Sequence, residues 1–301
     1  MPVTIAYQGE PGAYSEEALS STYPSAQPVS MRTLRHVFHR VADQTVDLAL
    51  APVENSQLGS VLETYDLLLE YRLLVVAEIA LQVDHCLLAA DGVERKGIRR
   101  VLSDAQSLAQ CEAFIVRERL DPVPVYDSAA AARLVREERR EDSAAIASRR
   151  AAYLHGLTVL SERIQTVHEN VTRFFLISRR GPRRVKPPRV KPPRMGWKTS
   201  LICAVRNEPG ALWALLGCFA ERGVNLSRLE SRPRREPPWE YAFYLDVDGR
   251  RSEKPVAAAI RDARPLTTFL HVLGTYPRAL PVAVPPKRRR RSKPRVPTGA
   301  P

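Results

Sequence analysis

Short apolar runs alternate with amphipathic segments along the first 180 residues of the chain. Runs typical of buried strands lie at 3–9, 46–54, 73–90 and 171–179, and helical spacing is found at 15–23, 34–44 and 59–71. Three further segments, 99–118, 124–138 and 143–156, each begin as a short strand and continue as a helix. Alternation of strands with helices of about 10 to 15 residues predicts an α/β fold with largely parallel sheets.

Helix-capping residues support this interpretation. Ser15 and Ser103 are placed to cap the helices that follow them, and Gly156 is placed to end a helix. In α/β folds of this kind ligands bind at the carboxyl ends of strands, which face helix N-termini.

A different pattern begins after residue 180. The tandem repeat "RVKPPRVKPPR" excludes helix and favours extended chain, so 181–195 is expected to be a linker. The elements expected beyond it follow the order βαββαβ, with strands at 199–205, 225–233, 241–248 and 267–277 and helices at 210–223 and 253–263. This order predicts a small ferredoxin-like domain at 196–280.

The formal net charge of +13 is concentrated in two proline-rich segments. Eight basic residues and no acid lie at 179–194, and seven more lie at 287–295. The rest of the chain therefore carries a formal charge of −2. Such segments suggest a solvated linker and a tail at 281–301, and the near-neutral remainder, with no aromatic residues among the basic ones of the tail, argues against nucleic-acid binding as the main function.

Composition narrows the class of protein further. With 301 residues and 44% hydrophobic residues, the chain can form one large core or two smaller ones. The four cysteines lack metal-binding spacing, and no export signal or uninterrupted apolar span is found, which leads us to expect reduced thiols, a cytoplasmic location and no membrane partner.

Polar residues recur where the pattern places strand ends and helix starts. They form four groups, Glu54-Asn55-Ser56, Ser103 with Gln106 and Gln110, Ser128, and Asn170-Thr172-Arg173. Taken singly, each is more often a cap or a solvated residue. Together they predict a cleft of hydroxyls, amides and one guanidinium that suits a small anionic substrate, with no metal or cofactor required.

These segments resemble a known family. "YQGEPGAYSEEA", "APVENSQLGSV", "HCLLA", "SLAQCEAF" and "NVTRF" match, in order, the prephenate dehydratases and the closely similar arogenate dehydratases. "PGALWALLGCFAERGVNLSRLESRP" is similar to the phenylalanine-sensing motifs of their ACT regulatory domain. The resemblance covers about residues 3 to 280.

The resemblance implies a two-lobed, periplasmic-binding-protein-like α/β catalytic region at 1–180. Lobe one would comprise about 1–79 and 172–180, and lobe two about 80–171. The ACT domain would follow at 196–280. It also implies conversion of prephenate to phenylpyruvate, feedback regulation by L-phenylalanine, and a homodimer or homotetramer formed through ACT domains.

Site residues follow from the resemblance position by position. It places the catalytic hydroxyl on Thr172, followed by Arg173 and Phe174. The residues expected to line the cleft are Glu54, Asn55, Ser56, Ser103 and Gln110. We expect Thr172 to bond the departing hydroxyl and Arg173 to anchor or orient a substrate carboxylate. An alternative role for Glu54 is to orient that arginine.

One position departs from the family pattern. Asp104 stands where the family commonly has histidine, and facing the cleft it would repel an anionic substrate. We expect its carboxylate to be exposed, because Ser103 and Gln110 of the same segment are retained. Glu169 receives no assigned role.

The resemblance places the effector site on two segments that follow the linker. It comprises Gly210, Ala211, Leu212, Asn225, Glu230, Ser231, Arg232 and Pro233. Two alternatives to prephenate dehydratase remain at this point: an arogenate dehydratase, and a non-catalytic amino-acid sensor of the same fold.

Overall fold

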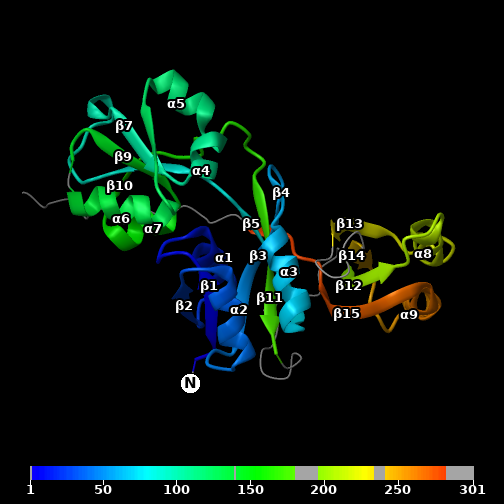
Figure 1. Cartoon of the computed structure of the whole chain (residues 1–301). Coiled ribbons are helices and arrows are strands. Elements are labelled where there is room, and N and C mark those ends of the chain that lie inside the picture. Colours follow the sequence, from blue (N-terminus) through cyan, green and yellow to red (C-terminus); the bar gives the residue numbers. More distant parts are fainter. Residues whose placement is uncertain (1, 139, 180–195, 234–240, 283–301) are drawn as a thin grey trace, which may run out of the picture.

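A computed structural model describes residues 2–138, 140–179, 196–233 and 241–282, which form three α/β units (Figure 1). The expected linker at 181–195 and nearly all of the expected tail lie outside these residues. The two-lobed α/β region and the C-terminal ferredoxin-like domain are both confirmed. None of the helices in the described ranges is long and apolar enough to cross a membrane.

Lobe one is built on a seven-stranded mixed sheet. Its order is β16-β5-β11-β3-β1-β2, and the short β4 pairs with β3. The strands are β1 (Thr4–Gln8), β2 (Gln27–Met31), β3 (Leu48–Asn55), β4 (Gly59–Ser60), β5 (Leu74–Gln82), β11 (Val171–Ser178) and β16 (Pro281–Val282). Its helices are α1 (Tyr14–Thr22), α2 (Leu34–Ala42) and α3 (Leu62–Tyr71).

Lobe two contains a five-stranded sheet of order β10-β6-β9-β7-β8. Its strands are β6 (Cys86–Ala89), β7 (Arg100–Ser103), β8 (Asp121–Pro124), β9 (Ser143–Ala147) and β10 (Thr158–Ser161). Its helices are α4 (Ala105–Gln110), α5 (Glu112–Glu118), α6 (Ser128–Glu138) and α7 (Arg149–His155), with a 3₁₀ turn at Arg95–Gly97. The chain crosses between the lobes after β5 and returns before β11, so two crossings join them.

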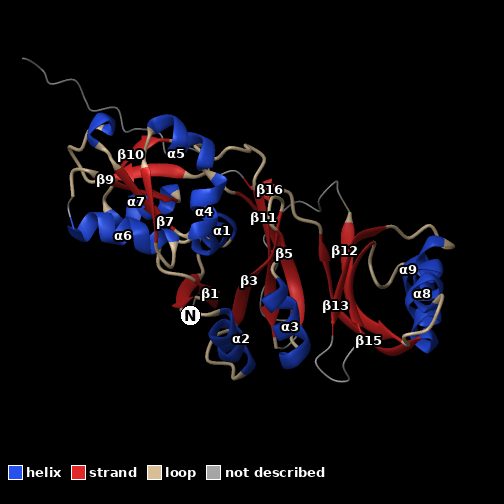
Figure 2. Cartoon of the chain, turned by 45° about the horizontal axis from the view of Figure 1, so that its top comes forward, coloured by secondary structure: helices blue, strands red, loops and turns tan. Residues whose placement is uncertain are grey.

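The C-terminal domain follows the expected βαββαβ order. Its elements are β12 (Trp197–Val205), α8 (Ala211–Ala220), β13 (Leu226–Pro233), β14 (Tyr241–Asp248), α9 (Lys254–Ala263), a 3₁₀ turn at Arg264–Leu266, and β15 (Thr267–Pro277). Both helices cover one face of the sheet, and the other face is turned toward lobe one (Figure 2).

The C-terminal sheet packs directly on lobe one. One hydrophobic core contains Val75 and Phe175 of lobe one together with Ile202, Tyr244 and Tyr276 of the C-terminal domain. The contact is close where β15 passes β5, because a Cβ at Gly274 would lie 1.9 Å from the carbonyl oxygen of Val75. A side chain there cannot be accommodated without separating the sheets, so the domain is seated on lobe one and not merely tethered to it.

The end of the described chain returns to lobe one. Val282 in β16 pairs with Leu81 of β5, and Leu81 pairs on its other side with Thr172 of β11. The expected tail at 281–301 therefore begins with two residues that belong to the lobe-one sheet.

Two helix caps differ from the sequence predictions. Ser15 is not a cap, since α1 begins at Tyr14 after Ala13, whose side chain makes no capping bond. Asp104, not Ser103, caps α4 by accepting a hydrogen bond from the Ser107 backbone N–H. Gly156 does end α7, with φ of 63°. Ser103 and Asp104 both have the chemistry of a cap, and the local backbone geometry selects Asp104.

Lobe one contacts lobe two through α1 and α7. The Ser148 hydroxyl donates to the Gly12 carbonyl oxygen at 2.6 Å, and Arg150 pairs with Glu16 at 2.5 Å. Beside this contact Glu17 is buried. Burial raises the pKa of the Glu17 carboxyl to about 7, although the backbone N–H and the guanidinium of Arg150 oppose this rise.

This pKa predicts a pH-dependent stability. Because the carboxyl titrates near 4.5 in the unfolded chain, its ionisation opposes folding as pH rises from 4.5 through 7. Glu17→Gln should raise the free energy of unfolding at pH 8 by on the order of 2 kcal/mol, and much less at pH 5. Urea denaturation at both pH values measures this. Glu63→Gln, at an exposed acid of α3, is the control, and equal effects of Glu17→Gln at both pH values would contradict the assignment.

Candidate active site

A cleft of about 780 Å³ lies between the two lobes. Lobe one lines it from the ends of β1 and β2, the start of α1, and parts of β3 and β11. Lobe two lines it from α4 and from the turn that begins α6. The residues predicted from the sequence that do line the cleft are Asn55, Gln106, Gln110, Ser128, Thr172 and Phe174.

The pairing of β3 with β11 places these residues and their neighbours. Thr172 lies opposite Asn55, and Arg173 lies opposite Glu54. Because successive side chains of a strand point to opposite faces of the sheet, one pair faces the cleft and the next faces away. Phe174, two residues beyond Thr172, also lines the cleft.

In the cleft-facing pair, the side-chain amide of Asn55 is held in one orientation. Its Oδ1 accepts the backbone N–H groups of Gln57 at 2.9 Å and Leu58 at 3.2 Å, which determines the orientation of its amide. Its Nδ2 therefore donates to Thr172 Oγ1 at 2.9 Å and to Asn170 Oδ1 at 2.7 Å. Because the Thr172 oxygen accepts from Asn55, its hydroxyl proton remains available for another acceptor.

The network continues from Asn170 to lobe two. Asn170 Nδ2 donates to Gln110 Oε1 at 3.0 Å, and His85 Nε2 bonds the same oxygen at 2.7 Å. The buried Nε2 of Gln110 has no hydrogen-bond partner among the described residues. An unpaired buried donor costs about 1 to 3 kcal/mol, and an oxygen of a bound ligand would satisfy it.

His85 links this network to α1. Since Gln110 Oε1 is an acceptor, Nε2 of His85 carries the proton, and Nδ1 accepts from the Tyr14 hydroxyl at 2.6 Å. Burial lowers the pKa of His85 and raises that of Tyr14, so both side chains are neutral at pH 7. The hydrogen bonds thus lead from Asn55 of lobe one through Asn170 to Gln110 of lobe two. From Gln110 they return through His85 to Tyr14 of lobe one.

Arg173 lies on the other face of the sheet and does not line the cleft. Its guanidinium bonds Glu54 at 2.5 Å, Glu78 at 3.1 Å and Asp246 of the C-terminal domain at 2.8 Å. Burial alone would lower the pKa of Arg173, but Glu78 and Asp246 raise it above its usual value. The prediction that Arg173 anchors a substrate carboxylate is therefore wrong for this structure, whereas its contact with Glu54 is confirmed. Glu54 likewise faces away from the cleft.

Two predicted cleft serines serve other contacts. Ser103 is fully buried at the end of β7, and its hydroxyl donates to the Ile146 carbonyl oxygen at 2.6 Å. Ser56 donates to the Glu169 carbonyl oxygen at 3.2 Å and accepts the Val171 N–H at 3.0 Å, which ties the β3–β4 turn to the start of β11. Neither lines the cleft, so both predictions are wrong.

The expected exposure of Asp104 away from the cleft is also wrong. Its carboxylate lines the cleft and accepts the Ser107 N–H at 2.9 Å and the Ser107 hydroxyl at 2.7 Å. The other two carboxylates of the cleft also have partners: Glu10 pairs with Arg133, and Asp127 accepts backbone N–H groups at the start of α6.

Arg32 is the one cation among the described residues that line the cleft. It follows β2, is exposed, and has no ion-pair or hydrogen-bond partner within the described part of the chain. The described residues also include no group of three or more side chains suited to hold a metal ion.

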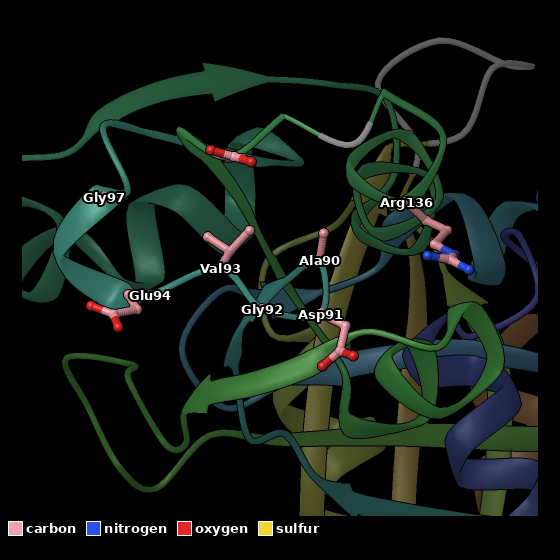
Figure 3. Close-up of a pocket in the computed structure, with 8 residues that line it drawn as sticks. Ala90, Asp91, Gly92, Val93, Glu94, Gly97 and Arg136 are labelled. Carbon is pink, nitrogen blue, oxygen red and sulfur yellow. The ribbon is translucent and has the colours of Figure 1, made fainter.

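A second hollow, of about 680 Å³, lies on lobe two (Figure 3). It is lined by the 90–97 segment with Asp91 and Glu94, and by Arg136 of α6. None of the predicted site residues lies in it, and the hydrogen-bond network described above does not reach it. The interlobe cleft is therefore the candidate active site.

Comparison with known proteins agrees with this geometry. The family model described as "Prephenate dehydratase" matches residues 5–182, and the ACT domain model matches residues 199–265. The chain belongs to the prephenate dehydratase family. It is an enzyme of that class, a decarboxylating hydro-lyase, with a C-terminal ACT domain.

Several relatives are similar over most of the chain. An arogenate dehydratase/prephenate dehydratase from Arabidopsis thaliana is 39% identical over 91% of this chain and 73% of its own length. The structure of a prephenate dehydratase from Arthrobacter aurescens in complex with L-Phe has 32% identity and a TM-score of 0.82, covering 94% of this chain and 93% of that one. A quorum-quenching acylase has 36% identity and a TM-score of 0.81, covering 91% and 97%.

Some of the predicted effector residues contact lobe one, and the others lie within the ACT domain. Glu230 bonds Ser60, and Arg232 pairs with Asp66 at 2.5 Å, so both are occupied by lobe one. Ser231 and Pro233, between and beyond them on β13, are exposed.

The other predicted effector residues remain within the ACT domain. Gly210 caps α8 with φ of 81°, Ala211 and Leu212 begin that helix, and Asn225 donates to Asp248 at 2.9 Å. No hydrogen bond or ion pair in the described ranges joins the 210–212 segment to β13. Effector binding by these residues stays a prediction.

Tyr14, His85 and Arg32 are among the residues of the dehydratase cleft that were not predicted from the sequence. Tyr14 and His85 lie in "GAYSEEA" and "DHCLL", and Arg32 follows β2. A single tyrosine, histidine or arginine carries no spacing signal. A histidine at the crossing between two strands was the clearest available indication, because both lobes meet there.

The placement of Ser103 yields a direct test. Ser103→Ala should lower the free energy of unfolding by about 1 to 2 kcal/mol, because the buried Ile146 carbonyl loses a donor. Both kcat and KM should stay within about twofold, since the side chain does not line the cleft. Urea denaturation and steady-state kinetics with prephenate measure the two effects. Gln110→Ala, which alters the cleft itself, is the comparison, and a tenfold loss of kcat/KM in Ser103→Ala would contradict this placement.

Proposed function

We propose that this enzyme acts on prephenate, removing carbon dioxide and the ring hydroxyl to give phenylpyruvate for L-phenylalanine biosynthesis. The observation that carries the proposal is a pair of donors without acceptors on two residues that line the cleft. One is the Thr172 hydroxyl, whose oxygen already accepts from Asn55, and the other is the unpaired Nε2 of Gln110. Preorganised donors of this kind stabilise an oxygen that gains negative charge during a reaction.

The reaction needs little covalent chemistry from the protein. The bond between the ring and its carboxylate breaks and releases carbon dioxide, its electron pair enters the ring, and the ring hydroxyl departs as hydroxide that takes up a proton. Formation of the aromatic ring supplies the driving force. The enzyme must bind the anion, align the scissile carboxylate with the ring, and stabilise the departing oxygen.

Thr172 is the group we assign to the departing hydroxyl. An unperturbed alcohol is a weak acid, so its contribution is a hydrogen bond to the leaving oxygen and not full proton transfer. Gln110 and Asn55 are assigned to positioning: Asn55 holds Thr172, and Gln110 offers its amide N–H groups to a substrate oxygen.

Thr172→Ala should lower kcat for prephenate by about 10²- to 10³-fold, in keeping with the loss of one such donor. Thr172→Ser keeps the hydroxyl and should retain most of the activity. Steady-state kinetics, with circular dichroism to verify folding, measure both. A folded Thr172→Ala enzyme with kcat within a few fold of wild type would refute the assignment.

Arg32 is the cation we assign to a substrate carboxylate in place of Arg173. Its guanidinium has no partner within the described ranges, and it lies at the end of β2 on the wall of the cleft. Arg32→Gln should raise KM for prephenate by about tenfold or more, with kcat changed less, because a charge-assisted bond contributes about 1.5 to 3 kcal/mol. Arg35→Gln, at an exposed arginine of α2 that pairs with Glu70, is the matched control and should leave KM unchanged. Equal KM values for Arg32→Gln and wild type would exclude this role.

The cleft geometry favours this lyase reaction over acyl transfer, the activity named for the similar quorum-quenching enzyme. Acyl transfer by a serine or cysteine needs a base beside the nucleophile. The histidine of the cleft, His85, is bonded at both ring nitrogens by Tyr14 and Gln110. Within the described ranges no serine, threonine or cysteine side chain bonds it.

Arogenate is the second candidate substrate, because relatives of this chain are named arogenate dehydratases and because Asp104 places a carboxylate in the cleft. Arogenate carries an ammonium group where prephenate has a keto oxygen. Each cleft carboxylate already has a partner, which favours the keto substrate. We therefore expect kcat/KM to be higher for prephenate, as a parallel assay of both substrates measures. A higher value for arogenate would reverse the assignment.

We also propose that L-phenylalanine regulates the enzyme through the ACT domain, with a homodimer or homotetramer as the active assembly. The ACT match and the phenylalanine complex of the Arthrobacter relative support the ligand. The position of β13 at one edge of the ACT sheet supports pairing with a second copy. A cytoplasmic location stays a proposal that rests on the sequence alone.

A further inference from the structure

The two polar pairs Glu54-Asn55 and Thr172-Arg173 connect the cleft to the ACT domain. Within each pair one side chain faces the cleft and its neighbour faces the opposite side of the sheet. Asn55 therefore bonds Thr172 on one face, while Glu54 bonds Arg173 on the other. A displacement of the Arg173 backbone would also move Thr172, because the two residues share a peptide bond.

The ACT domain holds Arg173 from the far face. Asp246 on β14 bonds Arg173 at 2.8 Å and also accepts the Ser200 hydroxyl of β12 at 2.5 Å. Lys198 of β12 pairs at 3.3 Å with Glu78, which is the second carboxylate on Arg173. The side chains of Arg173, Asp246 and Lys198 are each largely buried. If one partner were lost, water could not readily solvate the remaining charges.

A second contact reaches the same strands through the β3–β4 hairpin. Ser60, which lies opposite Glu54 in that hairpin, bonds both Glu230 and Arg228 of β13. Arg228 in turn pairs with Glu54 at 3.5 Å and lies opposite Asp246 in the β13–β14 register. The strand that carries the predicted effector segment thus contacts Glu54 directly and lies beside Asp246, the ACT-domain partner of Arg173.

The packing leaves little room to absorb a movement of the ACT sheet. Gly274 of β15 lies against the backbone of β5 at Val75, and the Tyr244 ring meets Tyr65 at 4.7 Å between centroids. Packed interfaces of this kind tend to switch between discrete arrangements and do not deform smoothly. A shift of β13 or β14 would therefore be transmitted to Glu54 and Arg173.

We propose that Arg173 is a positioning residue through which Asp246 of the ACT domain sets the position of Thr172, and that effector binding acts on catalysis through this contact and the Ser60 hairpin. This inference rests on the proposed function, since it takes Thr172 to act on the substrate.

The test compares kcat, KM and phenylalanine inhibition in the full-length chain. Asp246→Asn removes the charge that holds Arg173, and should lower kcat for prephenate by about tenfold or more with KM within about threefold, because small misplacements of a reacting group are costly. Asp246→Glu retains the carboxylate and should recover part of kcat. A residue needed only for folding would lower the active fraction, and with it the apparent kcat at unchanged KM. The rates are therefore normalised to the concentration of folded enzyme, and a purely structural role would then leave kcat equal to that of wild type.

Ser60→Ala provides a milder variant in case Asp246→Asn does not fold. It removes one hydroxyl from the hairpin contact and should lower kcat by about threefold or more and weaken inhibition by L-phenylalanine by a similar factor. Asp262→Asn is the matched control, because Asp262 pairs with Arg222 wholly within the ACT domain and should change neither quantity.

The outcomes separate the inference from the function on which it rests. A wild-type chain that does not consume prephenate or arogenate contradicts the proposed function. An active wild type with folded Asp246→Asn and Ser60→Ala variants whose kcat stays within twofold overturns the inference. Loss of kcat without any effect of phenylalanine on wild type retains the positioning role and rejects its regulatory part.

Discussion

The antiparallel pairing of β3 with β11 is the constraint on which both the cleft and the domain arrangement depend. Because neighbouring side chains point to opposite faces, the pairing delivers Asn55 and Thr172 to one side and Glu54 and Arg173 to the other. A slip of β11 by one residue would turn Thr172 toward the ACT domain and Arg173 into the cleft, while Asn55 and Glu54 of β3 kept their faces. Both the Asn55–Thr172 bond and the Glu54–Arg173 bond would be lost. The β3–β11 register therefore determines which side chains face the cleft and which face the ACT domain.

The charged side chains buried between lobe one and the ACT domain stabilise one another. Arg173, Glu78, Asp246 and Lys198 lie in a dry interface, where an ion is tolerated only with its partners in place. Removing one partner of such a cluster costs about 3 to 5 kcal/mol. The burial of Lys198 lowers its pKa despite the attraction of Glu78, as expected for a cation taken out of water. The ACT domain is consequently part of the lobe-one core and also the source of charges that lobe one requires.

Much of the architecture could be predicted from the sequence, because hydrophobic periodicity directly reflects burial. The alternation of strands and helices, the βαββαβ domain and the return of the chain through β11 all follow from local patterns. What local patterns do not contain is the direction of a side chain. "NVTRF" indicates a strand with polar residues at its start, yet only its pairing with β3 reveals that Thr172 and Arg173 diverge. The same limit applies to Ser103. It lies at a strand end, where a cleft residue is expected, but its hydroxyl donates to the Ile146 carbonyl oxygen inside lobe two. The Tyr14–His85–Gln110 contacts join three separate segments, and no local pattern reports such meetings.

The most direct test of the account is a crystal structure of the full chain with phenylpyruvate or an unreactive prephenate analogue in the interlobe cleft. The account predicts that Thr172 Oγ1, Gln110 Nε2 and Arg32 contact the ligand, while Arg173 remains bonded to Asp246 on the other face of the sheet. An Arg173 side chain that leaves Asp246 and binds a ligand carboxylate would contradict it.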